Sequence, residues 1–73
     1  MMSDNHVGKV TEVVGTSDKS IEDAIETALA RTAATIRNLQ WFHVTELRGA
    51  LTGDGKVSRY QVVMRVGFGL DDD

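Results

Sequence analysis

The stretch QWFHVTELRGALTGDGKVSRYQVVMRVGFGL, residues 40–70, decides the fold. The residues Thr52-Gly53-Asp54-Gly55 within it are typical of a hairpin turn, because Asp and Gly tolerate a positive φ. Residues 40–51 before this turn and residues 56–70 after it are therefore predicted as two long strands. The second strand alternates, with Tyr60, Val62, Met64, Val66 and Phe68 on one face and Arg59, Gln61, Val63 and Arg65 on the other.

A strand and a helix are predicted on the N-terminal side of this hairpin. Residues 7–14, VGKVTEVV, are rich in β-branched side chains and predict a strand that residues 15–17, GTS, bring to an end. Ser17 is the first candidate for the N-cap of the helix that follows, and Ser20 is the second. An apolar stripe predicts an amphipathic helix over residues 18–37, and it consists of Ile21, Ala24, Ile25, Ala28, Leu29, Thr32 and Ile36.

The order of elements is thus β-α-β-β in a single α+β domain. The chain has 73 residues, which leaves room for one domain only. We assign residues 7–70 to this domain, residues 1–6 to a flexible N-terminal tail and residues 71–73 to a short acidic tail. So short a chain rarely buries enough apolar surface by itself, and it has no Cys for disulfides, so we expect it to oligomerise.

Composition argues against several classes of protein. A net charge of −3 with scattered Lys and Arg residues argues against a nucleic-acid-binding protein. No apolar run approaches the ~20 residues of a membrane-spanning helix, so no membrane partner is expected, and residues 1–6 do not begin a signal peptide. The lack of Cys excludes thiolate metal sites and fits a cytoplasmic location.

The sequence carries no catalytic signature, so neither a catalytic residue nor a metal site is predicted. Gly67-Phe68-Gly69 ends a strand with no helix after it, which favours a strand end that needs small residues over a nucleotide-binding loop. His43 and Glu46 lie three residues apart on a strand, so we expect them on opposite faces of the sheet. They are therefore not expected to form a metal-binding or acid–base pair.

Three side chains are candidates for ligand binding. Trp41 is a core or interface residue, which the pattern alone slightly favours, or a platform on which a flat heterocycle stacks. Gln61 is a solvated side chain, or it recognises a ring edge that presents a donor beside an acceptor, because an amide can do both. Arg48 is a phosphate contact or, by default, a salt-bridged or solvated charge.

Five motifs occur in one order along residues 7–70. They are Val14-Gly15-Thr16-Ser17, Arg37-Asn38-Leu39, Trp41-Phe42-x-Val44-x-Glu46-x-Arg48-Gly49, Tyr60-Gln61-Val62 and Val66-Gly67-Phe68. Together they resemble the dodecins, a family of small flavoproteins. The resemblance implies a three-stranded antiparallel sheet that is partly wrapped around one helix, and a hollow homododecamer.

The resemblance also implies a function for the three candidate residues. In dodecins, flavins bind in pairs at subunit interfaces, each ring between an indole and its partner flavin. The family Trp corresponds to Trp41 and the Gln that bonds the pyrimidine edge corresponds to Gln61, so both become binding residues. Arg48 matches an Arg near the ligand phosphate, which favours flavin mononucleotide (FMN) over riboflavin. The implied role is flavin storage, sequestration and photoprotection, and not enzymatic turnover.

The sequence departs from the family pattern at two informative positions. Position 69 is Gly where many bacterial members carry Arg, which puts a second site for coenzyme A in doubt. His43 stands where Glu is common, and a titratable group there suggests the hypothesis of pH-sensitive binding or assembly. The alternative functions are an assembly protein with weak or no flavin binding and, with least support, a small flavin-dependent enzyme.

Overall fold

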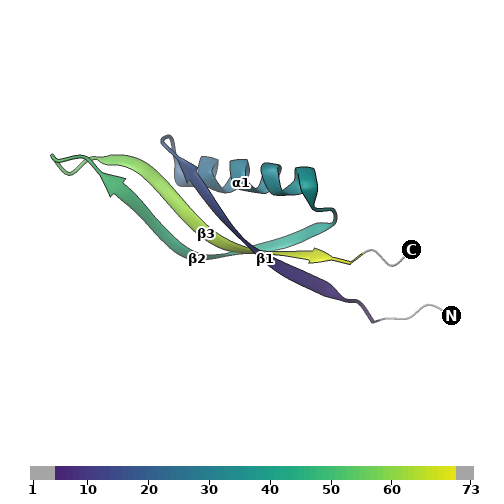
Figure 1. The fold of residues 1–73 in the computed structure, drawn as a ribbon. Coiled ribbons are helices and arrows are strands. Elements are labelled where there is room, and N and C mark those ends of the chain that lie inside the picture. The colour runs from purple at the N-terminus through teal and green to yellow at the C-terminus, as the bar shows by residue number, and fades with distance from the viewer. Residues whose placement is uncertain (1–4, 71–73) are drawn as a thin grey trace.

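The computed structural model describes residues 5–70 of the chain, and the predicted tails lie outside that range except for Asn5 and His6. Its elements are β1 (Gly8–Ser17), α1 (Ile21–Thr35), β2 (Leu39–Leu51) and β3 (Val57–Gly69). The strands form one antiparallel sheet in the order β1-β3-β2, with α1 lying along one face (Figure 1). The predicted β-α-β-β order and fold class are confirmed. Within residues 5–70 the structure has no helix long and apolar enough to cross a membrane.

Strand β1 extends further than the sequence pattern indicated. Residues 15–17 were expected to end it, yet they continue the pairing, with Gly15 opposite Val62 and Ser17 opposite Tyr60. The reason for the glycine is tertiary, because a Cβ at Gly15 would collide with the backbone oxygen of Ala24 on α1. Gly15 therefore allows helix and strand to approach closely.

The ends of α1 differ from the prediction as well. The N-cap is Ser20 and not Ser17, since the Ser20 hydroxyl accepts a hydrogen bond from the Asp23 backbone N–H at 2.9 Å. The Ser17 hydroxyl instead donates to the Asp23 carboxylate at 2.7 Å. At the other end the helix ends at Thr35, two residues before the predicted limit, and Asn38 turns the chain with a φ of 64°.

The hairpin between β2 and β3 is the element that the sequence predicted best. Its turn lies at residues 52–56, where the Gly55 N–H donates to the Thr52 carbonyl at 3.0 Å. Gly55 has a φ of 86°, which glycine adopts without strain. Both strands lie within one residue of their predicted limits at each end.

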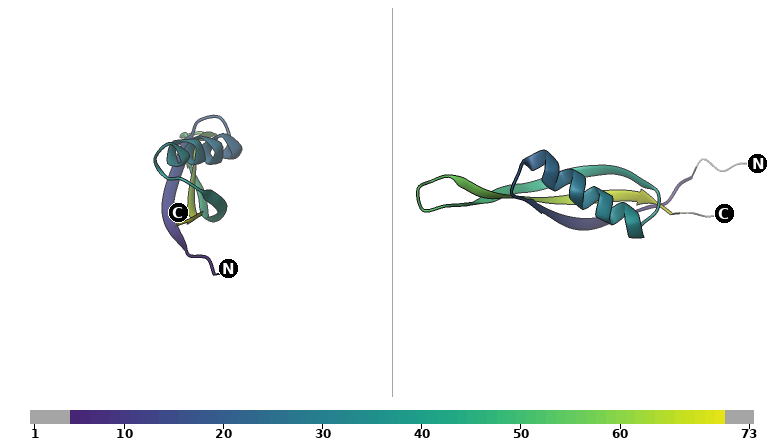
Figure 2. Two further views of the ribbon diagram at one scale, coloured as in Figure 1. Left: turned by 90° about the vertical axis from the view of Figure 1, so that its right-hand side faces the viewer. Right: turned by 90° about the horizontal axis from the view of Figure 1, so that it is seen from above.

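The core lies between α1 and the two strands that it covers, β1 and β3. Its fully buried side chains on β3 are Val62, Met64 and Val66, which is the alternating face that the sequence predicted. From α1, Ala24 and Ala28 close the other side, and their small size lets the helix lie close to the sheet. The end-on view in Figure 2 shows α1 on one side of the sheet, and no other helix or strand of residues 5–70 lies against the opposite side.

Strand β2 is paired along one edge but is covered on neither face. Residues 40–49 are all exposed, and they include Trp41, Phe42, Val44 and Leu47. The hairpin also projects past the end of α1, so the molecule measures 63 × 20 × 14 Å (Figure 2). Its radius of gyration of 15.7 Å exceeds the ~11 Å of a compact chain of this length. So extended a shape fits the prediction that the chain associates with further copies.

Candidate functional site

The outer face of the sheet, opposite α1, carries all three predicted binding residues. Strand pairing places its side chains in rows that cross β1, β3 and β2. The rows are Val10–Gly67–Trp41, Glu12–Arg65–His43, Val14–Val63–Glu46 and Thr16–Gln61–Arg48. Polar and apolar groups are mixed along this face, which is therefore neither a core surface nor a fully solvated one.

The placement of Glu46 corrects one expectation. His43 and Glu46 were predicted on opposite faces, but both pair with outer-face residues of β3, Arg65 and Val63. The cause is a β-bulge between Val44 and Glu46, which inserts one extra residue and reverses the alternation. The bulge thereby places Glu46 and Arg48, which are two residues apart and share a face, on the same outer face as Trp41 and His43.

The indole of Trp41 lies against the backbone of β3 at Gly67, at one end of the outer face. A Cβ built on Gly67 would overlap the indole, so the contact requires a glycine at that position. Trp41 is nevertheless 49% exposed, which leaves an area of aromatic surface free for a ligand or another chain. The prediction that Gly67 satisfies a need for small residues is confirmed, and the need comes from Trp41.

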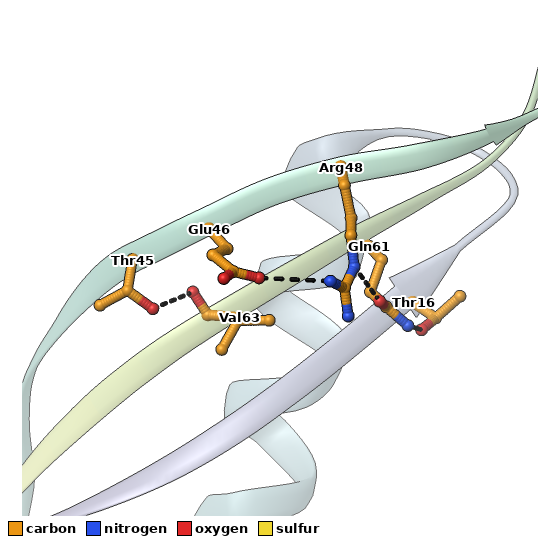
Figure 3. Close-up of polar contacts among 6 residues, drawn as sticks. All are labelled: Thr16, Thr45, Glu46, Arg48, Gln61 and Val63. Carbon is orange, nitrogen blue, oxygen red and sulfur yellow. Dashed lines mark hydrogen bonds and ion pairs between the residues drawn. The ribbon is translucent and has the colours of Figure 1, made fainter.

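Gln61 lies in the row at the other end of the outer face, between Thr16 on β1 and Arg48 on β2. The Arg48 Nε–H donates to the Gln61 amide oxygen at 2.7 Å (Figure 3). The Gln61 amide nitrogen donates to the Thr16 hydroxyl at 3.4 Å, which is a long hydrogen bond. Glu46 forms an ion pair with Arg48 at 3.3 Å on the far side. Gln61 is thus part of an ordered polar row and not a freely solvated side chain.

A shallow depression of about 300 Å³ lies over this polar row. It is lined by Thr16, Arg48, Gly49, Ala50, Arg59 and Gln61. The two arginines give the depression a positive charge, which suits an anionic or carbonyl-bearing ligand. A second depression of about 360 Å³ lies between α1 and β2, and its lining includes Leu29, Ala33, Trp41 and Phe42.

Trp41 and Gln61 are far apart within one chain. Their rows are centred on Gly67 and Gln61, six residues apart along β3, which is a separation of about 20 Å. That distance exceeds the length of a three-ring heterocycle. A flat ligand that stacks on the indole and bonds the amide must therefore take these two groups from different copies of the chain.

The titratable groups outside the polar row include Asp54 in the hairpin turn and His43 on the outer face. Within residues 5–70 there is no group of three or more His, Asp or Glu side chains that could hold a metal ion. The pKa of Asp54, in the hairpin turn, is held below its ordinary value, chiefly by the hydrogen bond from the Thr52 hydroxyl. His43 is exposed in the row with Glu12 and Arg65, and its role in pH dependence stays a prediction.

Comparison with known proteins decides the family. A sequence model of the dodecins matches residues 7–71. This chain belongs to the dodecin family. The dodecin of Thermus thermophilus is 50% identical over 66 residues, which are 90% of this chain and 94% of that protein.

Solved structures of other dodecins have the same fold. The dodecin from Streptomyces davaonensis is 46% identical with a TM-score of 0.86, and the match covers 93% of this chain and 98% of that one. For the Streptomyces coelicolor dodecin the identity is 42% and the TM-score 0.86, over 97% of this chain and all of that one. Dodecins are small flavin-binding and storage proteins.

The sequence analysis found the three candidate side chains but missed the residues that hold them. Gly67 beneath the indole, Thr16 beside the amide and Glu46 beside the guanidinium were not predicted as parts of a site. Gly67 and Thr16 lie on other strands than their partners, so spacing along one strand could not reveal them. Glu46 lies two residues before Arg48 on β2, and that spacing could have found it. Counting residue pairs outward from the hairpin turn would place Gly67 opposite Trp41, but only if the positions of the bulges were known.

Proposed function

We propose that this protein stores and sequesters flavin, with pairs of flavins bound between subunits of a homododecamer. The observation that carries the proposal is the separation of Trp41 and Gln61 on one exposed face. A site within one chain cannot use both, whereas a site between chains can. Membership of a flavin-binding family supports flavin as the ligand.

The residues present fit a flavin ring. The exposed indole of Trp41 offers a π-face on which an isoalloxazine can stack, and Gly67 leaves the space that the indole occupies. The Gln61 amide can form a hydrogen bond with the pyrimidine edge of the ring. No general acid or base is required for storage.

Photoprotection follows from the same contact. Bound flavin supplies a light-absorbing ring, and Trp41 stacked on it can donate an electron to the excited ring and take it back. That cycle returns both groups to their ground states with no net chemistry. Photoprotection therefore needs only van der Waals contact between Trp41 and the ring.

FMN is the flavin that we propose as the main ligand, with riboflavin as the second choice. Arg48 supports FMN because its guanidinium lies at the positively charged depression beside Gln61. Coenzyme A at a second site stays a prediction outside this proposal. The hollow of about 410 Å³ around Gly69 has no Lys or Arg among its described lining residues, so it offers no side-chain cation for a pyrophosphate.

The surface that joins the subunits is proposed to include β2 and its apolar side chains. Phe42, Leu47 and Leu51 are 47%, 54% and 67% exposed, although each is a large apolar residue. Phe42 and Leu47 pair with Val66 and Val62 on the helix side of the sheet, and Leu51 pairs with Val57 beside the hairpin turn. A second copy that covered this strip would remove it from water, which is the driving force that a chain of this size lacks alone.

Mixing two binding-defective variants tests whether the site lies between chains. Trp41→Ala and Gln61→Ala are each expected to weaken FMN binding, the first by about 1–3 kcal/mol if stacking is the main contribution. When the two variants are refolded together, some interfaces combine an intact Trp41 with an intact Gln61. We therefore expect tight sites to reappear in the mixture, measured by flavin fluorescence quenching.

The control is the same total protein refolded separately and mixed afterwards, which should show weak binding only. Tight sites that never reappear in co-refolded protein would contradict a shared site. If neither variant nor the unaltered protein binds flavin while the large assembly persists, the chain acts as an assembly protein without the ligand.

A further inference from the structure

We propose that Arg48 is a positioning residue that fixes the amide of Gln61 in one orientation, and so determines which ring edge the site accepts. The inference rests on the proposed flavin site and gives Arg48 a role there besides a phosphate contact. It is carried by the hydrogen bond of 2.7 Å from the Arg48 Nε–H to the Gln61 amide oxygen.

The chemistry of the two groups leaves only one orientation for the amide. A guanidinium has five N–H donors and no acceptor, so it can face the amide oxygen but not the amide NH2. The oxygen of Gln61 is therefore turned toward β2, and its NH2 group is turned toward β1. There it meets the Thr16 hydroxyl, which accepts from it at 3.4 Å (Figure 3).

The two hydrogen bonds of Gln61 differ in strength. The bond from Arg48 is short and charge-assisted, whereas the bond to Thr16 is long and neutral. A ligand can therefore displace Thr16 far more easily than Arg48. The site then presents an N–H donor to the ligand, which selects a ring edge with a carbonyl acceptor, such as the pyrimidine edge of a flavin.

Arg48 is itself held in place by its other neighbour. Glu46 accepts from the Arg48 guanidinium at 3.3 Å, on the side away from Gln61. Both side chains are exposed, so this ion pair adds little stability. It does hold the guanidinium between Glu46 and Gln61 and offsets part of its charge, which favours a role in orientation over one in charge attraction alone.

If Arg48 holds Gln61 in its binding orientation, the site should bind its ligand more tightly. An exposed Gln must give up several rotamers when it binds a ligand, and an amide already held by Arg48 gives up fewer. The gain applies to every ligand that uses the ring edge, whether or not it carries a phosphate. FMN and riboflavin share this edge and differ by the phosphate, so the pair of ligands separates the two roles of Arg48.

The test is the affinity of Arg48→Ala for both ligands, measured by fluorescence quenching on the intact assembly. We expect riboflavin to bind about 3- to 10-fold more weakly than to the unaltered protein, and FMN to weaken at least as much. Arg48→Lys keeps the charge but not the fixed fork of donors, so riboflavin should remain weak. Arg31→Ala, which removes the same charge from the exposed side of α1, is the control and should bind as the unaltered protein does.

A double-mutant cycle shows whether Arg48 acts through Gln61. In a Gln61→Ala background, Arg48→Ala should weaken riboflavin no further. Unchanged riboflavin affinity in Arg48→Ala, with FMN alone weakened, would overturn the positioning role and leave a phosphate contact. Equal losses from Arg48→Ala with and without Gln61 would overturn it too. The proposed function fails separately, if the unaltered protein binds neither flavin or if Trp41→Ala binds as tightly as before.

Discussion

The two faces of β3 show how one strand can serve stability and recognition at once. On the helix side Val62, Met64 and Val66 are fully buried, and they form most of the core. On the outer side Gln61 and Val63 are only half-buried, and Arg65 is exposed. Because consecutive residues alternate between these faces, a substitution can disturb one property and spare the other.

The largest effect is expected in the core, from Met64→Ala. Met64 has no exposed surface, so its truncation removes buried contacts and leaves a cavity at the centre of the helix–sheet interface. We expect the free energy of unfolding to fall by about 2–5 kcal/mol, measured by denaturant unfolding at one protein concentration. Val63→Ala, one residue away on the outer face, is the matched control and should cost less than half as much. Equal costs would show that the two faces are not separate.

An intermediate effect is expected where the outer face depends on the strand itself, at Gly67. The Cβ in Gly67→Ala would lie where the Trp41 indole lies, so the ring must leave the sheet surface. We expect FMN affinity to fall by about 1 kcal/mol or more and the emission of Trp41 to shift, while denaturant stability changes less than in Met64→Ala.

Gly69→Ala is the control for that substitution, because it makes the same change two residues along the same strand. Its Cβ would meet the end of the Gln40 side chain at 2.7 Å, and that flexible side chain can move aside. Gly69→Ala should therefore keep both FMN affinity and Trp41 emission near those of the unaltered protein. The same loss in both variants would mean that Gly67 has no particular role beneath the indole.

The smallest effect is expected far from both faces, at the hairpin turn. The Thr52 hydroxyl and the nearby backbone N–H groups lower the pKa of Asp54. A pKa lowered by folding stabilises the native state above the unfolded value of about 3.9, and this contribution is lost as the pH falls through the folded value. We expect Thr52→Ala to raise the pKa of Asp54 toward the ordinary value, as followed by NMR titration, and flavin affinity at neutral pH to stay unchanged. An unaltered Asp54 titration would contradict the role of the hydroxyl.

The sequence predicted what depends on neighbours along the chain. The turn at Gly55, the alternation from Tyr60 to Phe68 and the amphipathic helix all follow from local patterns, and the structure confirms each. The predicted end of β1 was wrong because Gly15 makes room for Ala24 on α1 and does not break the strand. The face predicted for Glu46 relative to His43 was wrong, because no distinctive residue marks the bulge between Val44 and Glu46.

The candidate site was predictable in its residues but not in its arrangement. Trp41, Gln61 and Arg48 could be chosen by residue type and by resemblance, yet their spacing on the sheet depends on register. The structure joins Arg48 to Gln61 and separates both from Trp41 by about 20 Å. If the three residues bind one flavin, as we propose, that separation requires a site between chains.

The central claim is tested most directly by titrating FMN and riboflavin into refolded, ligand-free protein while the flavin fluorescence is recorded. The account predicts saturable quenching near one flavin per subunit, with light scattering showing a large assembly throughout. An intact assembly that quenches neither flavin would contradict it, because the outer face would then serve only the association of subunits.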